Sequence, residues 1–164
     1  MCIRDRDILG AGGARQKLIT TLNQGVGVAQ YFGHSGPSVW SFDWIFTDQD
    51  AAQLTNQGRP SVVFQWGCWN AYYVWPTENT LGHRLMLSGD RGAAATLGAT
   101  TLSDFESDRA LGQSFVPRSV QPGVSIGEAL IAAKQEVGAA HPGKMSDVMA
   151  GWTILGDPAL VIEP

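Results

Sequence analysis

Residues 61–68 read SVVFQWGC, a short apolar run that ends in a glycine and a cysteine. The run is rich in β-branched and aromatic side chains, which predicts a buried β-strand with Cys68 directly after it. Residues 26–32, VGVAQYF, form a second run of this kind, and it ends at Gly33, which His34 follows. A cysteine and a histidine therefore each stand at the carboxyl end of a predicted strand.

Helical patterns alternate with these apolar runs. Apolar residues at helical spacing predict four helices, at residues 14–23, 48–56, 81–87 and 125–137. Further strands are expected at residues 93–97 and at either 152–155 or 159–162, and a polar-aromatic loop is expected after His34. The alternation predicts an α/β fold with a mainly parallel sheet flanked by helices. In such sheets ligands bind beyond the carboxyl ends of the strands, the edge that holds His34 and Cys68.

The composition limits the class of protein. The 164 residues are 44% hydrophobic and 16% charged, as expected for one globular domain. The net charge is −4 and the Lys and Arg residues are scattered, so nucleic acid is not expected as a partner. No apolar run reaches the ~20 residues of a membrane span, and the charged start, MCIRDRDILG, is unlike a signal peptide. Two cysteines and three histidines at scattered spacings predict neither a disulfide framework nor a metal site of the zinc type.

Cys68 and His34 together suggest nucleophilic catalysis. A thiol becomes a strong nucleophile when a neighbouring imidazole takes its proton. The two residues lie 34 positions apart, which fits one strand–helix–strand crossover between adjacent parallel strands. Gly33, Gly36 and Gly67 flank them and allow a substrate to approach the backbone closely. By chemistry alone, a small buried cysteine of structural role is an equally good interpretation.

Five segments resemble, in the same order, segments of the gingipain-type cysteine peptidases of the caspase-like clan. They are the catalytic-His segment VGVAQYFGHSGPSVW at 26–40, the catalytic-Cys segment VVFQWGCWNAYY at 62–73, the Gly-Ala-rich strand RGAAATLGATTLS at 91–103, the late helix SIGEALIAAK at 125–134 and the closing strand ILGDPALVI at 154–162. The resemblance covers nearly the whole chain after its first residues.

The resemblance implies a cysteine endopeptidase that acts on protein or peptide substrates. Cys68 would attack the scissile carbonyl, and His34 would give a proton to the leaving amine. The backbone N–H groups of Ser35 and Cys68 would hold the oxyanion, and no cofactor would be needed. Ser35 stands where the family commonly has glycine, so a positive φ there would strain the backbone. The family also implies a secreted or cell-surface protein.

The resemblance further implies that the caspase-like fold is incomplete. Residues 11–164 would form the C-terminal part of a catalytic domain, the half that carries the His and the Cys. The family's earlier strands, which shape the specificity pocket, would belong to a missing N-terminal part of the same domain. Residues 1–10 are interpreted as a leader, a candidate non-native extension. We therefore expect little activity from these residues alone and an unpaired edge on their sheet.

Two other functions stay open. The sequence GHSGP at 33–37 imitates the nucleophile elbow of an α/β-hydrolase and would make Ser35 the nucleophile, but Pro37 stands where that motif needs glycine. A caspase-like domain that binds a ligand without catalysis is the second alternative. The glycine-rich segment GAGGAR at 10–15 resembles a phosphate loop, although a loop that enters a helix is the simpler interpretation.

Other polar and aromatic residues have simpler interpretations. Asp104, Glu106 and Asp108 suggest a structural calcium ion, whereas a solvated loop is the simpler prediction. His83 is interpreted as a surface or pocket-rim residue and His141 as a turn residue. Three tryptophans near Cys68 are candidates to line a substrate groove, with core packing as the default: Trp66, Trp69 and Trp75.

Overall fold

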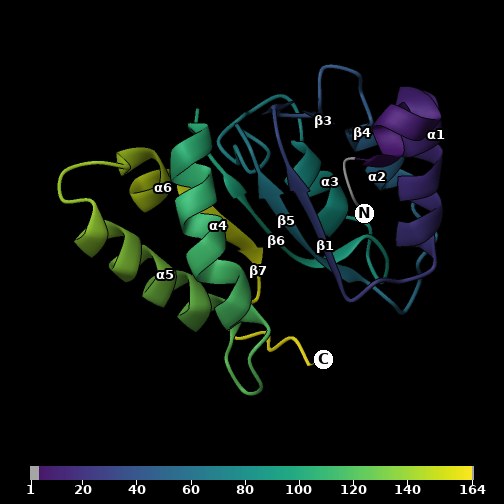
Figure 1. The fold of residues 1–164 in the computed structure, drawn as a ribbon. Helices are drawn as coiled ribbons and strands as arrows, with labels where there is room; N and C mark the ends of the chain where they lie inside the picture. The colour runs from purple at the N-terminus through teal and green to yellow at the C-terminus, as the bar shows by residue number, and fades with distance from the viewer. Residues whose placement is uncertain (1–3, 164) are drawn as a thin grey trace.

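A four-stranded sheet forms the centre of the protein. The computed structural model describes residues 4–163, and Figure 1 shows the sheet between two groups of helices. The strands are β1 (Val28–Phe32), β5 (Ser61–Trp66), β6 (Ala93–Ala99) and β7 (Trp152–Gly156), in the order β1-β5-β6-β7. The first three run parallel, and β7 is antiparallel to β6. The predicted α/β class with a mainly parallel sheet is confirmed.

The central strand β5 is buried along its whole length. It pairs with β1 on one side and with β6 on the other, so the sheet satisfies its backbone groups. Its side chains alternate between two hydrophobic cores, because Val62, Phe64 and Trp66 face one core and Val63 faces the other. A strand covered on both faces needs apolar residues at nearly every position, which explains the continuous apolar run SVVFQW.

Helices cover both faces of the sheet. One group consists of α4 (Phe105–Ser119), α5 (Ile126–Ala140) and α6 (Ser146–Gly151), and the other of α1 (Arg4–Asn23), α2 (Asp48–Ala52) and α3 (Leu81–Met86) (Figure 1). Helix α5 shows how the sequence fixes such an element, because Ser125 and Glu128 form a capping box at its start. Its buried residues recur at helical spacing: Ile126, Ala129, Leu130, Ala133 and Val137. Within residues 4–163, no helix has the length and apolar character to cross a membrane.

A second, small antiparallel sheet follows His34. It consists of β2 (Ser35–Gly36), β3 (Val39–Trp40) and β4 (Phe46–Thr47). Trp40 is buried and stacks on Tyr31 of β1 with ring centroids 4.8 Å apart, so it ties this sheet to the central one. Strands of two residues carry no readable alternation, and the sequence therefore predicted only a loop here.

The N-terminal helix differs from the prediction. α1 begins at Arg4, well before residue 14, and the glycine-rich segment at 10–15 lies within it. Only Gly10 departs from helical geometry, with a φ of 69°. The interpretation of this segment as a loop is therefore wrong, and the boundary of the predicted leader falls inside a helix.

Two further helices were not predicted. α4 contains Gly112 and Pro117, which lower helix propensity, and α6 has only six residues. α2 is shorter than expected and ends at Ala52. The sheet closes with β7, whereas the alternative segment 159–162 contributes only a bridge from Val161 to Ser125.

Phe115 of α4 offers a test of the core. Its side chain is fully buried and meets Phe64 with ring centroids 4.9 Å apart. We expect Phe115→Ala to lower the free energy of unfolding by about 3–5 kcal/mol, because the cavity cannot close completely. Urea unfolding measures this. Phe42→Ala is the matched control, because Phe42 is 82% exposed, and it should change the free energy by less than about 0.5 kcal/mol. Equal effects of the two changes would contradict the packing described.

Candidate active site

The parallel pairing of β1 and β5 brings His34 and Cys68 to the same edge of the sheet. Phe32 at the end of β1 is in register with Trp66 at the end of β5. The ladder continues one step further, because the Gly33 N–H donates to the Trp66 carbonyl at 3.0 Å. His34 and Cys68 each come two residues after the last register pair. The predicted placement of both residues at adjacent strand ends is thus observed.

Direct contacts join the two loops. The Ser35 hydroxyl donates to the Cys68 carbonyl at 2.9 Å. Gly67 lies so close to the other loop that a Cβ on it would overlap the Gly33 carbonyl oxygen and the Ser35 hydroxyl. Glycine is needed at this position for steric reasons, since its Cα is packed against the neighbouring backbone.

His34 has a fixed backbone and an exposed side chain. Its carbonyl oxygen accepts hydrogen bonds from the Ser41 N–H at 2.8 Å and from the Tyr31 hydroxyl at 2.6 Å. Its ring lies beside the Phe42 ring, with centroids 5.1 Å apart, and Phe42 itself is largely exposed. The imidazole is therefore accessible to a substrate.

Cys68 is a free, half-buried cysteine whose sulfur faces Ser103. The thiol donates to the Ser103 carbonyl oxygen at 3.6 Å, and the Ser103 hydroxyl oxygen lies 4.0 Å from the sulfur. Ser103 comes from the loop after β6, the strand on the other side of β5. Ser103 could not be identified from the sequence, because nothing in its spacing marks a contact with Cys68.

Asp108 is the third residue of this group. It is buried in α4, with 5% of its surface exposed, and its Oδ2 accepts the Ser103 hydroxyl at 2.9 Å. Burial raises the pKa of Asp108 from 3.8 to about 6, against the opposing effect of the Ser103 hydrogen bond, and the charges of Asp147 and Asp104 add to the rise. The interpretation of residues 104–108 as a solvated loop is therefore wrong.

The acidic residues near Asp108 have separate roles. Asp104 caps α4 by accepting the Glu106 N–H at 2.9 Å and the Ser107 N–H at 3.4 Å. The hydrogen bond from the Ser107 hydroxyl lowers the pKa of Asp104. Glu106 forms an ion pair with Arg109 at 2.7 Å. Within the part of the chain that the structure describes, no three His, Cys, Asp or Glu side chains are grouped so that they could hold a metal ion. Calcium binding stays a prediction.

The remaining histidines, His83 and His141, lie at the ends of helices, where they take part in capping. His83 lies in α3, where its Nδ1 is 3.1 Å from the Thr80 hydroxyl oxygen in a capping box. Burial lowers the pKa of His83. His141 is the C-cap of α5, which agrees with its interpretation as a turn residue.

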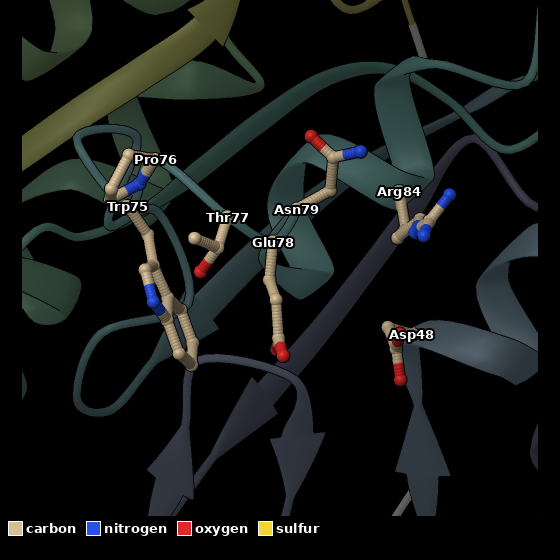
Figure 2. Close-up of a pocket in the computed structure, with 7 residues that line it drawn as sticks. All are labelled: Asp48, Trp75, Pro76, Thr77, Glu78, Asn79 and Arg84. Carbon is tan, nitrogen blue, oxygen red and sulfur yellow. The ribbon is translucent and has the colours of Figure 1, made fainter.

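The three tryptophans near Cys68 separate into different environments. Trp66 is buried and stacks on Trp152 with centroids 4.8 Å apart, whereas Trp69, directly after Cys68, is 38% exposed. Trp75 lies in a polar depression of about 510 Å³ (Figure 2). The other residues that line the depression are Asp48, Pro76, Thr77, Glu78, Asn79 and Arg84. His34 and Cys68 are not part of this lining.

A mainly parallel sheet with a histidine loop and a cysteine loop at adjacent strand ends defines a caspase-like cysteine peptidase fold. The sequence matches the profile of Peptidase family C25 over residues 6–163, and the chain belongs to that family. The resemblance to the gingipain-type peptidases is thereby confirmed. No curated protein sequence matches the chain.

Solved gingipain structures share the fold. The complex of the Porphyromonas gingivalis RgpB pro- and mature domains has a TM-score of 0.81 at 19% identity, over 90% of this chain and 37% of that one. The Arg specific cysteine proteinase gingipain R has a TM-score of 0.74 at 18% identity, over 90% of this chain and 36% of that one. A further protease has a TM-score of 0.76 at 15% identity, over 87% of this chain and 37% of that one. The chain thus spans little more than a third of the length of these proteins.

Gly67 provides a test of the contact between the two loops. We expect Gly67→Ala to lower the free energy of unfolding by about 1–3 kcal/mol, since the added methyl group meets backbone that cannot move away. Gly27→Ala is the matched control, because a Cβ at Gly27 meets no atom within 4 Å. Urea unfolding of both variants measures the difference. A Gly67→Ala variant as stable as the Gly27→Ala variant would show that the loops are not in contact.

The buried carboxyl of Asp108 predicts a dependence of stability on pH. Its pKa of about 6 in the fold exceeds the ordinary value of 3.8, so proton binding stabilises the fold. This stabilisation is complete below pH 3.8 and is lost as the pH rises through 6. We expect the free energy of unfolding to fall by about 1–2 kcal/mol more in the wild type than in Asp108→Asn between pH 5 and about 7.5.

Urea unfolding at a series of pH values measures this difference. The exposed Asp90→Asn variant is the matched control and should follow the wild type. Parallel pH curves for the wild type and Asp108→Asn would contradict the assignment.

Proposed function

We propose that this chain carries the catalytic dyad of a cysteine endopeptidase, with Cys68 as the nucleophile and His34 as its proton-transfer partner. The observation that carries the proposal is the joining of the two loops at the carboxyl edge of β1 and β5, through the Gly33–Trp66 and Ser35–Cys68 hydrogen bonds. Such an edge is where α/β sheets bind their ligands. Membership of Peptidase family C25 supports the same reaction class.

The reaction proceeds in two stages. His34 takes the thiol proton, and the Cys68 sulfur attacks the carbonyl carbon of the scissile bond. As the C–N bond breaks, His34 gives the proton to the leaving amine. His34 then accepts a proton from water while the water oxygen attacks the thioester carbonyl carbon. The C–S bond breaks, the acid product leaves, and His34 returns the proton to the Cys68 thiolate. Each proton is carried by a single imidazole, in line with the exposed ring of His34.

Backbone N–H groups of Ser35 and Cys68 hold the oxyanion in this proposal. One feature of the Cys68 loop and one of the Ser35 backbone support these roles. The peptide group that follows the Cys68 N–H is held in place, because the Cys68 carbonyl accepts the Ser35 hydroxyl at 2.9 Å and the Trp69 N–H donates to the Thr101 carbonyl at 3.1 Å. Ser35 lies in β2, and it is not among the described residues with a positive φ, so the expected strain at this position does not arise.

The serine hydrolase alternative has less support. Ser35 is the first residue of β2 and leads into the hairpin with β3, whereas a nucleophile elbow leads from a strand into a helix. Its hydroxyl is already engaged with the Cys68 carbonyl. These contacts favour a structural role for Ser35, as the link between the two loops.

The wider context of the domain is also a proposal. The chain corresponds to about 37% of the RgpB chain, and β1 forms one edge of the described sheet. We infer that an N-terminal part of the same domain completes the specificity pocket beside this edge and that the substrate is a protein or peptide. A secreted or cell-surface location agrees with the gingipain-type relatives.

Substitution of the dyad tests the proposed function in the intact protein. We expect Cys68→Ala to abolish hydrolysis of a panel of peptides, because the nucleophile is gone. His34→Gln should lower kcat/KM by about 10²–10⁴, the range typical for loss of a general acid–base. His141→Gln is the matched control and should leave kcat/KM unchanged, because His141 ends α5.

Two outcomes would contradict the proposal. Undiminished turnover by Cys68→Ala would exclude Cys68 as the nucleophile. Labelling of Cys68 by a thiol-directed peptide inhibitor at the same rate in the wild type and in His34→Gln would exclude the dyad and favour a binding domain without catalysis.

A further inference from the structure

The sulfur of Cys68 faces two oxygens of one residue. The Ser103 carbonyl accepts the thiol proton at 3.6 Å, and the Ser103 hydroxyl oxygen lies 4.0 Å from the sulfur. The hydroxyl also donates to Asp108 Oδ2 at 2.9 Å. A continuous line of polar contacts therefore runs from the buried carboxyl of α4 to the proposed nucleophile.

The single proton of the Ser103 hydroxyl makes these contacts mutually dependent. A hydroxyl donates one hydrogen bond and accepts others. When Asp108 is ionised it only accepts, so the Ser103 proton points to Asp108 and a lone pair faces the sulfur. When Asp108 is protonated it donates to the Ser103 oxygen, and the Ser103 proton is free to turn toward the sulfur.

We propose that Ser103 and Asp108 are positioning residues for Cys68, in which the ionisation of Asp108 decides whether Ser103 presents a lone pair or a proton to the sulfur. The importance of this arrangement for catalysis rests on the proposed function of Cys68. The arrangement itself depends only on the three contacts. Ser103 acts on the sulfur that it contacts, and Asp108 acts on the sulfur through the Ser103 hydroxyl.

The surroundings of Asp108 raise its pKa toward neutral pH. Burial raises its pKa to about 6. Asp147 of α6 and Asp104 at the start of α4 add negative charge that acts in the same direction. Trp152 of β7 acts in the opposite direction, although its indole N–H and Asp108 Oδ1 are both buried without a completed hydrogen bond. Both forms of Asp108 can therefore be populated between about pH 5 and 7.5.

The reactivity of Cys68 toward a small neutral alkylating reagent tests the proposal. The rate is followed by mass spectrometry of the Cys68 peptide between about pH 4.5 and 9. His34→Gln serves as the background, because it removes the imidazole as a second proton acceptor for the thiol. We expect an inflection near pH 6, where the alkylation rate departs two- to ten-fold from the curve of a thiol with a single ionisation. A change of this size is about the effect of one hydrogen bond.

Matched variants in the same background identify the groups responsible. Ser103→Ala and Asp108→Asn should each remove the inflection, whereas Ser103→Thr keeps a hydroxyl and should retain it. Asp147→Asn removes a nearby charge and should move the inflection to lower pH. If Asp108→Asn does not fold, the comparison of Ser103→Ala with Ser103→Thr decides the question.

Two results would overturn the proposal. One is a His34→Gln curve without an inflection near pH 6, and the other is an inflection that persists in both Ser103→Ala and Asp108→Asn. Because the readout is alkylation and not hydrolysis, it is independent of whether His34 and Cys68 form a catalytic dyad. Failure of the proposed dyad would appear in the peptide assay of Cys68→Ala and His34→Gln, whereas failure of the positioning proposal would appear in the alkylation curves of the Ser103 and Asp108 variants.

Discussion

The parallel pairing of β1 with β5 is the constraint on which the candidate site depends. The register of Phe32 with Trp66, continued by the Gly33–Trp66 hydrogen bond, fixes where the two loops leave the sheet. A slip of one residue would turn every side chain of β1 to the opposite face and separate His34 from Cys68 along the edge. Gly67 then allows the loops to touch, because it has no side chain between them.

Two hydrophobic cores hold this edge in place from opposite faces. On one face Trp66, at the end of β5, packs on Trp152 and Phe115. On the other face Trp40 stacks on Tyr31, and the Tyr31 hydroxyl in turn holds the His34 carbonyl. Large rings at the ends of the strands thus support the backbone from which His34 and Cys68 project. Functional side chains on such a rigid support need little ordering when a substrate binds.

Asp108 shows a conflict between stability and the site. A carboxylate with a buried, unpartnered oxygen is unfavourable for folding at neutral pH, as its raised pKa indicates. An apolar or amide side chain at this position would avoid that cost. The carboxylate nevertheless controls the direction of the Ser103 hydroxyl, and residues that lower stability in this way are typical of functional sites.

The sequence by itself determined the class of fold and the place of the two proposed catalytic residues. Buried parallel strands need continuous apolar runs, so residues 61–66 could be identified as β5 and Cys68 as the residue beyond it. The small sheet after His34 and the role of Ser103 and Asp108 were decided only by the tertiary structure. Two-residue strands have no period, and Asp108 resembles a solvated acidic residue until α4 packs against β5 and buries it. Contacts between distant segments leave no mark on local spacing, because they arise from the packing of elements that each follow their own pattern.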